Sequence, residues 1–157
     1  MSHFMGTFRH AVDRKGRFSI ASQHVAGVAA SGDGVFVVAP GPEGCLDAYP
    51  KDEWTRRERI LRSLLGGRDG RYYSRVIIGQ ARECQLDGHN RILVPPEILA
   101  RAGITNSVVI VGQLDHLELW PPKAYDAYLA AQTTTIEDVI EDVDARRNER
   151  PRDRRDW

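Results

Sequence analysis

An internal repeat constrains the fold of this chain more than any other feature of its 157 residues. Val12–Ile20 has a partner 74 residues later at Leu86–Val94, and Val35–Val38 has a partner at Val109–Val111 with the same offset. Ordered matches at one spacing predict two copies of a small unit. Because a unit of about 74 residues is marginal alone, we expect the copies to pack together as one pseudo-twofold body. At an offset of 73 residues, Gly6 and Arg9 match Gly79 and Arg82. At an offset of 71 residues, Leu46, Pro50 and Trp54 match Leu117, Pro121 and Tyr125.

The two copies are expected to share one order of short strands and helices, which predicts an α+β fold. Turn residues separate successive strands, so each tight turn is expected to close a hairpin. Ser22 is expected to cap the first helix, and Pro50 to occupy the first position of the second. The elements predicted in the first copy are strands Thr7–Val12, Arg17–Ile20, Val35–Ala39 and Cys45–Tyr49, with helices Gln23–Ala30 and Pro50 to about Leu65. Those predicted in the second are strands Glu83–Leu86, Arg91–Val94, Ser107–Val111 and Leu117–Trp120, with helices Glu97–Ala102 and Pro122–Ala131. Helix Arg68–Ile78 is expected to join the copies, and a helix from Ile136 to about Asp144 to precede a charged, disordered tail.

The net charge of zero conceals an uneven distribution along the chain. Residues 51–82 carry nine basic and four acidic groups, whereas residues 83–132 carry three basic and six acidic groups. A polyanion senses the local field rather than the total charge, so the basic stretch is compatible with nucleic acid. The alternative is that Arg56 to Arg82 lie on the solvated side of helices.

Several classes of protein are not expected from this sequence. No run of 18 apolar residues is present, so no membrane span is predicted, and the first residues lack the pattern of a signal peptide. Cys45 and Cys84 are expected to be reduced thiols, as in a cytoplasmic protein. The five histidines lack the spacing of metal ligands, and no nucleophile or nucleotide-binding motif occurs. We therefore expect no enzyme, no catalytic residue, no cofactor and no metal.

The first Asp-x-x-x-Arg motif is the stronger candidate for contact with DNA. Arg14, Lys15 and Arg17 place three cations within four residues at a turn, and arginine suits bidentate contact with guanine. Gly16 permits a positive φ, so that the cations project without strain. The alternative is that Asp13 pairs with Arg17 to brace the turn, and for the aspartate alone this interpretation is favoured.

The second motif offers fewer charges. Arg91 is its only certain cation, and His89 can be charged or neutral near neutral pH. Asn90 could donate to bases or fill a turn position, while Asp87 and Gly88 favour the turn itself. A mainly structural role is expected here, which makes the two motifs unequal.

Four segments together resemble the MraZ family, transcriptional regulators of bacterial division and cell-wall gene clusters. The resemblance covers residues 4–131 in order and with matching spacing, and it leaves the tail after Ala131 uncovered. The segments are Met5-Gly6-Thr7, Asp13-x-Lys15-Gly16-Arg17, Gly79-x-Ala81-x-Glu83-Cys84-Gln85-Leu86-Asp87, and Val111-Gly112-Gln113 followed by Leu117-Glu118-Leu119-Trp120.

The resemblance implies two tandem AbrB-like swapped-hairpin halves that form a pseudo-dimeric β-barrel-like core with flanking helices. The halves are expected at 5–55 and 79–131, with a helical connection at 56–78 and a tail at 132–157. It also implies a ring-like homo-oligomer that binds promoter repeats in double-stranded DNA, as a nucleoid-associated repressor in the cytoplasm. The alternative function is an oligomeric protein-interaction scaffold without DNA binding. The residues expected to contact DNA are Arg14, Lys15, Arg17, His89, Asn90 and Arg91, supported by Asp13, Gly16, Asp87 and Gly88.

Overall fold

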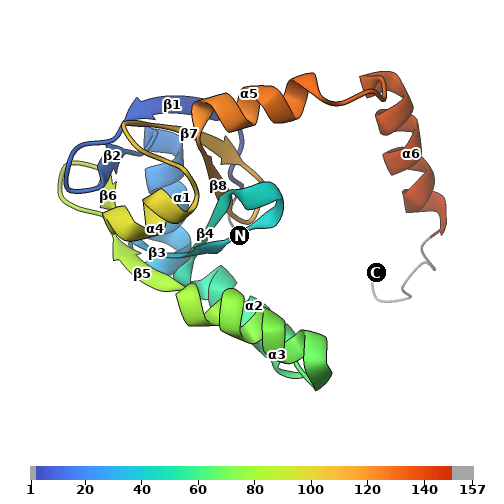
Figure 1. The fold of residues 1–157 in the computed structure, drawn as a ribbon, viewed down its shortest axis with the longest axis horizontal. Helices are drawn as coiled ribbons and strands as arrows, with labels where there is room; N and C mark the ends of the chain where they lie inside the picture. The colour runs from blue at the N-terminus through green and yellow to red at the C-terminus, as the bar shows by residue number, and fades with distance from the viewer. Residues whose placement is uncertain (1–2, 150–157) are drawn as a thin grey trace. The chain divides into compact units, whose positions relative to one another are not determined.

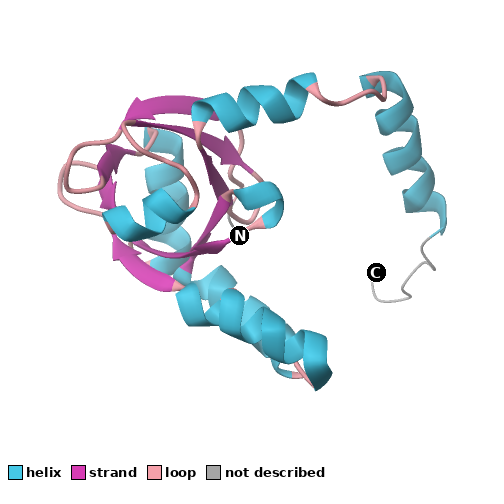
Figure 2. Cartoon of the chain, in the orientation of Figure 1, coloured by secondary structure: helices cyan, strands magenta, loops and turns pink. Residues whose placement is uncertain are grey.

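The computed structural model describes residues 3–149, which form an α+β fold of eight strands and six α-helices (Figures 1 and 2). The fold class predicted from the sequence is confirmed. The first part of the chain contains β1 (Thr7–Ala11), β2 (Arg17–Ser19), α1 (Ser22–Gly32), β3 (Val35–Pro40), β4 (Leu46–Pro50) and α2 (Lys51–Arg62). The remainder contains α3 (Gly67–Val76), β5 (Arg82–Gln85), β6 (Arg91–Leu93), α4 (Pro96–Arg101), β7 (Ser107–Gly112), β8 (Leu117–Trp120), α5 (Pro122–Ala130) and α6 (Ile136–Glu149).

Two antiparallel sheets organise the strands. Six strands form one sheet in the order β1-β7-β8-β4-β3-β5, and β2 pairs with β6 in a second sheet. This order is symmetric about its centre, the β8–β4 pair. Each strand of the first part has its counterpart at the mirrored position: β4 opposite β8, β3 opposite β7, and β1 opposite β5. The larger sheet is open at β1 and β5, so the expected barrel-like core is corrected to an open sheet. Closure would need a ladder between β1 and β5, but the chain turns from each of them into β2 and β6, which pair with one another.

The expected hairpins are correct for one pair of strands in each copy and wrong for the other. β3 pairs with β4 and β7 pairs with β8, as predicted. β1 instead pairs with β7, and β5 pairs with β3, while β2 and β6 pair with each other. The turns at Asp13 and Asp87 therefore reverse the chain, but the strands on either side form no ladder beyond the single bridge of Leu86 with Ile92.

Two predicted helix starts also differ from the structure. Ser22 is the first residue of α1, whose N-cap is Ala21 and has no side-chain capping bond. Pro50 ends β4 and serves as the N-cap of α2, so this helix begins at Lys51. At the other end of α1, Asp33 takes a left-handed conformation and its N–H donates to the Val28 carbonyl.

One continuous core joins both copies of the repeat. Phe18 of β2 and Ile92 of β6 are opposite one another and each is 1% exposed. They pack with Phe36 of β3, Ile110 of β7 and the apolar faces of α1 and α4. Because this core contains residues from both parts of the sequence, neither part forms it alone. Cys84 of β5 also belongs to this core and is 3% exposed.

Aromatic residues cover the other face of the large sheet. Tyr49 and Trp54 pack together beside Val37, and Trp120 packs with Tyr125 beside Val109. Trp54 and Trp120 are buried, so they close this side of the sheet and are not exposed for stacking on bases.

The chain divides into two compact units, Met1–Tyr125 and Asp126–Trp157. The first unit contains both sheets and α1 to α4 (Figure 1). Within it, α2 and α3 lie side by side, and Arg57 Nη2 donates to the Tyr73 hydroxyl at 3.2 Å. In the second, α6 continues to Glu149, beyond the expected end near Asp144; the rest of the predicted tail lies outside the described residues. None of the described helices is both long and apolar enough to cross a membrane.

Candidate nucleic-acid interface

The first Asp-x-x-x-Arg turn is built around the Asp13 carboxylate. Its Oδ1 accepts the backbone N–H groups of Lys15 and Arg17, each at 2.9 Å, and its Oδ2 accepts Arg17 Nε at 2.7 Å. Two main-chain bonds close the same turn, from Asp13 N to the Arg17 carbonyl and from Gly16 N to the Asp13 carbonyl. Asp13 therefore braces the turn, and the arginine still has guanidinium N–H groups beyond Nε for other partners.

The second turn repeats this arrangement bond for bond. Asp87 Oδ1 accepts the backbone N–H groups of His89 at 2.8 Å and Arg91 at 2.9 Å, and Oδ2 accepts Arg91 Nε at 3.0 Å. The bracing interpretation of the motif spacing is thus confirmed in both copies. Asn90 takes the place of Gly16, and its φ of 59° is the left-handed conformation that asparagine tolerates better than most residues.

The two turns hold each other in place through their main chains. Val94 N donates to the Gly16 carbonyl, and Ile20 N donates to the Asn90 carbonyl, each at 3.0 Å. These reciprocal bonds flank the β2–β6 ladder, in which Arg17 lies opposite Leu93 at one end and Arg91 lies opposite Ser19 at the other. Main-chain hydrogen bonds therefore tie the two turns to opposite ends of one two-stranded sheet, formed by β2 and β6 (Figure 1).

Exposure distinguishes the tips of the turns from their braced ends. Arg14 and Lys15 are exposed, as are Gly88, His89 and Asn90 in the second turn. The side chains of Arg17 and Arg91 are 32% and 33% exposed. The structure thus brings the predicted residues to the ends of one small sheet, with two cations at the first tip where the second has glycine and histidine.

Both aspartates are held in the ionised form. Hydrogen bonds from the backbone N–H and then the guanidinium of Arg17 lower the pKa of Asp13 from 3.8 to about 2. The Arg91 backbone N–H, followed by that of His89 and the Arg91 side chain, lowers the pKa of Asp87. The carboxylates consequently keep their bracing bonds throughout the neutral range.

Two arginines of the basic stretch make contacts within the protein. Arg56 Nη1 lies 3.0 Å from Oε1 of the buried Glu53. Arg57 donates to Tyr73 and lies over the Tyr49 ring, 5.3 Å from its centroid. For these two residues a structural role on the helix surface is supported, and the turn cations remain the stronger candidates for a nucleic-acid contact.

Sequence reasoning missed the main-chain partners of the turns. Ile20 and Val94 are buried strand-end residues whose N–H groups fix the opposite turn. Neither has a distinctive side chain, and the only indication was their equivalent place in the repeat, three residues after Arg17 and Arg91.

Comparison with known proteins gives consistent matches over most of the chain. Residues 3–64 and 77–147 match the family described as "MraZ protein, putative antitoxin-like". The chain is 32% identical over 141 residues to the transcriptional regulator MraZ of Acidovorax sp. (strain JS42), which covers 88% of this chain and 97% of that protein. It is 34% identical over 141 residues to the protein of the same name from Natranaerobius thermophilus, covering 89% and 96%. For the Heliobacterium modesticaldum protein of that name, identity is 35% over 139 residues, covering 88% and 94%.

Proposed function

The chain belongs to the MraZ family of transcriptional regulators, and we propose that it acts by binding short promoter repeats in double-stranded DNA. The observation that carries this proposal is the first braced turn, whose backbone is held by the Asp13 carboxylate beside the β2–β6 ladder and which exposes Arg14 and Lys15. A turn whose backbone is already held before binding loses less conformational entropy when its cations meet phosphates or base edges. Arg17 is proposed to contribute its terminal nitrogens, with Asp13 setting the plane of the guanidinium.

The second turn is proposed to have a smaller share in the contact. Gly88 and His89 stand where the first turn has Arg14 and Lys15, so Arg91 supplies its one permanent charge. His89 and Asn90 are exposed and could reach DNA as hydrogen-bonding groups. We expect the first turn to dominate affinity and the second to adjust orientation.

The proposed ancestry of the fold is a pair of AbrB-like swapped-hairpin halves joined in one chain. Support comes from the symmetric strand order and from the reciprocal bonds of Gly16 with Val94 and Asn90 with Ile20. The proposed halves are residues 5–55 and 79–131, connected by 56–78 and followed by 132–157. Such an arrangement gives each chain two related turns for two related contacts.

Self-association into a ring-like homo-oligomer is proposed because single chains offer few cations. Ile136, Val139, Ile140 and Val143 form an aliphatic stripe on α6, and each is at least 40% exposed. A stripe at this spacing is typical of a helix that packs against a partner. Linked copies would bind adjacent repeats at high effective concentration, which raises overall affinity without new contacts.

The proposed targets are the bacterial division and cell-wall genes, including the region upstream of the chain's own gene, where binding would repress transcription. The protein would then act in the cytoplasm in association with the nucleoid. An interaction scaffold that binds only proteins is the alternative, and its apolar helix faces would suffice for that role.

Fluorescence anisotropy tests the proposal with a labelled duplex from the upstream region and a second duplex of the same composition with scrambled repeats. Wild-type protein should prefer the first duplex. The variant Arg14→Ala/Lys15→Ala should bind it at least tenfold more weakly, because each subunit loses two exposed cations. The control variant Arg101→Ala/Lys123→Ala removes the same charge from exposed helix positions and should bind as wild type does. The proposal would be refuted if the two double variants bound DNA equally. It would also be refuted if wild type bound no DNA at low salt but still captured protein partners in 1 M salt.

A further inference from the structure

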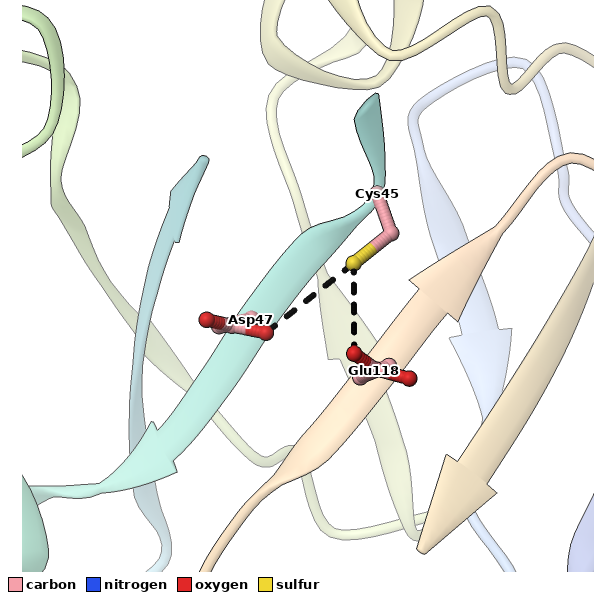
Figure 3. A group of neighbouring side chains, drawn as sticks. All are labelled: Cys45, Asp47 and Glu118. Atoms are coloured by element: carbon pink, nitrogen blue, oxygen red, sulfur yellow. Dashed lines mark hydrogen bonds between the residues drawn. The ribbon is translucent and has the colours of Figure 1, made fainter. Parts of the chain in front are cut away.

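Three side chains with metal-binding atoms meet where β4 pairs with β8. Cys45 precedes β4, Asp47 lies within it, and Glu118 is directly opposite Asp47 on β8. The Cys45 Sγ lies 4.0 Å from Asp47 Oδ1 and 3.6 Å from Glu118 Oε2 (Figure 3). All three donor atoms lie within 4.8 Å of one another.

A histidine adjoins this cluster with one ring nitrogen already oriented. His116 Nδ1 lies 2.7 Å from Oδ1 of the exposed Asp115, while Nε2 lies 3.5 Å from Asp47 Oδ1. The imidazole also stacks on Tyr49, with ring centroids 4.5 Å apart. A histidine whose second nitrogen is held by a carboxylate is the usual arrangement around a protein-bound metal, because the carboxylate fixes the tautomer and the ring.

Three separations between the donor atoms approach those expected around a tetrahedral cation. Bond lengths of about 2.3 Å to sulfur and about 2.0–2.2 Å to nitrogen or oxygen place neighbouring ligand atoms roughly 3.3–3.6 Å apart. The three separations that join Cys45, Asp47, Glu118 and His116 are 3.5, 3.6 and 4.0 Å. The donor atoms of Cys45, Asp47 and Glu118 already lie within 4.8 Å of one another, and a rotation of the His116 side chain would have to bring its Nε2 into the same range.

The surroundings keep the donors together in a shielded place. Cys45 and Asp47 are 1% and 7% exposed. Trp120 Nε1 donates to Glu118 Oε1 at 3.2 Å, which leaves Oε2 toward the thiol. Gly41 makes room for the Asp47 carboxylate, since a Cβ at residue 41 would lie 2.6 Å from Oδ1. The buried Asp47 and half-buried Glu118 carboxylates place negative charge beside the thiol, where a bound cation would be stabilised.

We propose that Cys45, Asp47, Glu118 and His116 bind a divalent cation of the Zn²⁺ class. Thiolate, imidazole and carboxylate together are the ligands that such borderline cations take. Binding would replace the thiol proton by a sulfur–metal bond, and the proton would pass to solvent. Because β4 and β8 come from different copies of the repeat, the cation would link the two copies across the middle of the large sheet.

The proposal reverses the sequence-based expectation that no metal binds. That expectation rested on histidine spacing, but Cys45 and Glu118 are 73 residues apart and only the β4–β8 pairing brings them together. The site was therefore invisible to local motif searches.

The full-length protein, freed of metal with a chelator, would be titrated with Co²⁺ as a spectroscopic probe and with Zn²⁺ by calorimetry. Wild type should bind one ion per chain, with thiolate-to-cobalt charge-transfer absorption and a raised unfolding temperature. Cys45→Ser should lose that absorption, and Glu118→Gln should bind Zn²⁺ at least tenfold more weakly. Cys84→Ser is the matched control, because Cys84 is also buried but belongs to no group of metal-binding side chains among residues 3–149, so the variant should bind metal as wild type does.

Circular dichroism before titration would establish that each variant is folded. Should Cys45→Ser not fold, Glu118→Gln and His116→Gln carry the test by their Zn²⁺ affinities. The proposal would be overturned if folded wild type showed no charge-transfer absorption, if Cys84→Ser abolished it, or if folded Cys45→Ser or Glu118→Gln bound as tightly as wild type.

Discussion

Replacement of Gly16 by alanine tests whether the two turns are mutually fixed. Gly16 has a φ of +91°, and a Cβ there would overlap the carbonyl oxygen of Val94, a main-chain atom of a fully buried residue. A left-handed backbone costs a non-glycine residue roughly 1–2 kcal/mol. Displacement of Val94 also weakens the bond from its N–H to the Gly16 carbonyl, which is worth about 0.5–1.5 kcal/mol. Gly16→Ala should therefore destabilise the protein by about 1.5–3.5 kcal/mol.

Urea denaturation followed by circular dichroism would measure this change, with Gly88→Ala as the control. Gly88 lies in the equivalent turn, but a Cβ there would meet no atom within 4 Å and its φ is not positive. Gly88→Ala should consequently leave the free energy of unfolding unchanged within about 0.5 kcal/mol, or raise it slightly. Equal unfolding free energies for the two variants would refute the view that Gly16 is fixed against Val94.

Three further predictions follow from the turns and from α6. Asp13 should titrate near pH 2 when followed by NMR of its carboxyl group. Because this folded pKa lies below the unfolded value of 3.8, the stabilisation from ionised Asp13 should be complete above pH 3.8 and disappear as the pH falls through about 2. A titration midpoint at or above pH 3.8 would contradict the bracing bonds. Ile140→Glu should weaken self-association at least tenfold, because it places a charge in an apolar interface, whereas Glu141→Gln on the same helix should not weaken it. Light scattering would measure the oligomeric mass of each variant over a range of concentrations. An unchanged mass for both variants would exclude α6 from the interface. Gly88→Arg/His89→Lys should tighten DNA binding measured by anisotropy, since it gives the second turn the cations of the first; weaker or unchanged binding would show that this turn does not face DNA.

The sequence predicted the composition of the turns better than the partners of their strands. Asp-x-x-x-Arg spacing indicated a braced turn, and both copies have the expected pair of Asp13 with Arg17 and Asp87 with Arg91. The same turn residues also suggested simple hairpins, yet β1 pairs with β7 and β2 with β6. Turn chemistry determines where the chain reverses, but the ladder partner depends on which strands can bury their apolar faces together.

The exact start of one helix and the contacts between distant residues could not be predicted from the sequence. Ser22 has a side chain suited to an N-cap, but α1 begins at Ser22 itself and Ala21 is the N-cap. The meeting of Cys45 with Glu118 depends on the β4–β8 register, which no local pattern specifies. The repeat did indicate that the two copies share one core, because a single copy has too few apolar residues to form its own.

The salt dependence of DNA binding tests most directly whether the first turn contacts DNA. The slope of log K against log salt concentration reports the number of phosphates that the protein neutralises. Removing Arg14 and Lys15 together should make the slope less negative by about two for each subunit bound to the duplex, with the oligomeric mass and unfolding temperature unchanged. A slope identical to that of wild type would mean that these cations do not contact phosphates, and the proposed interface would be wrong.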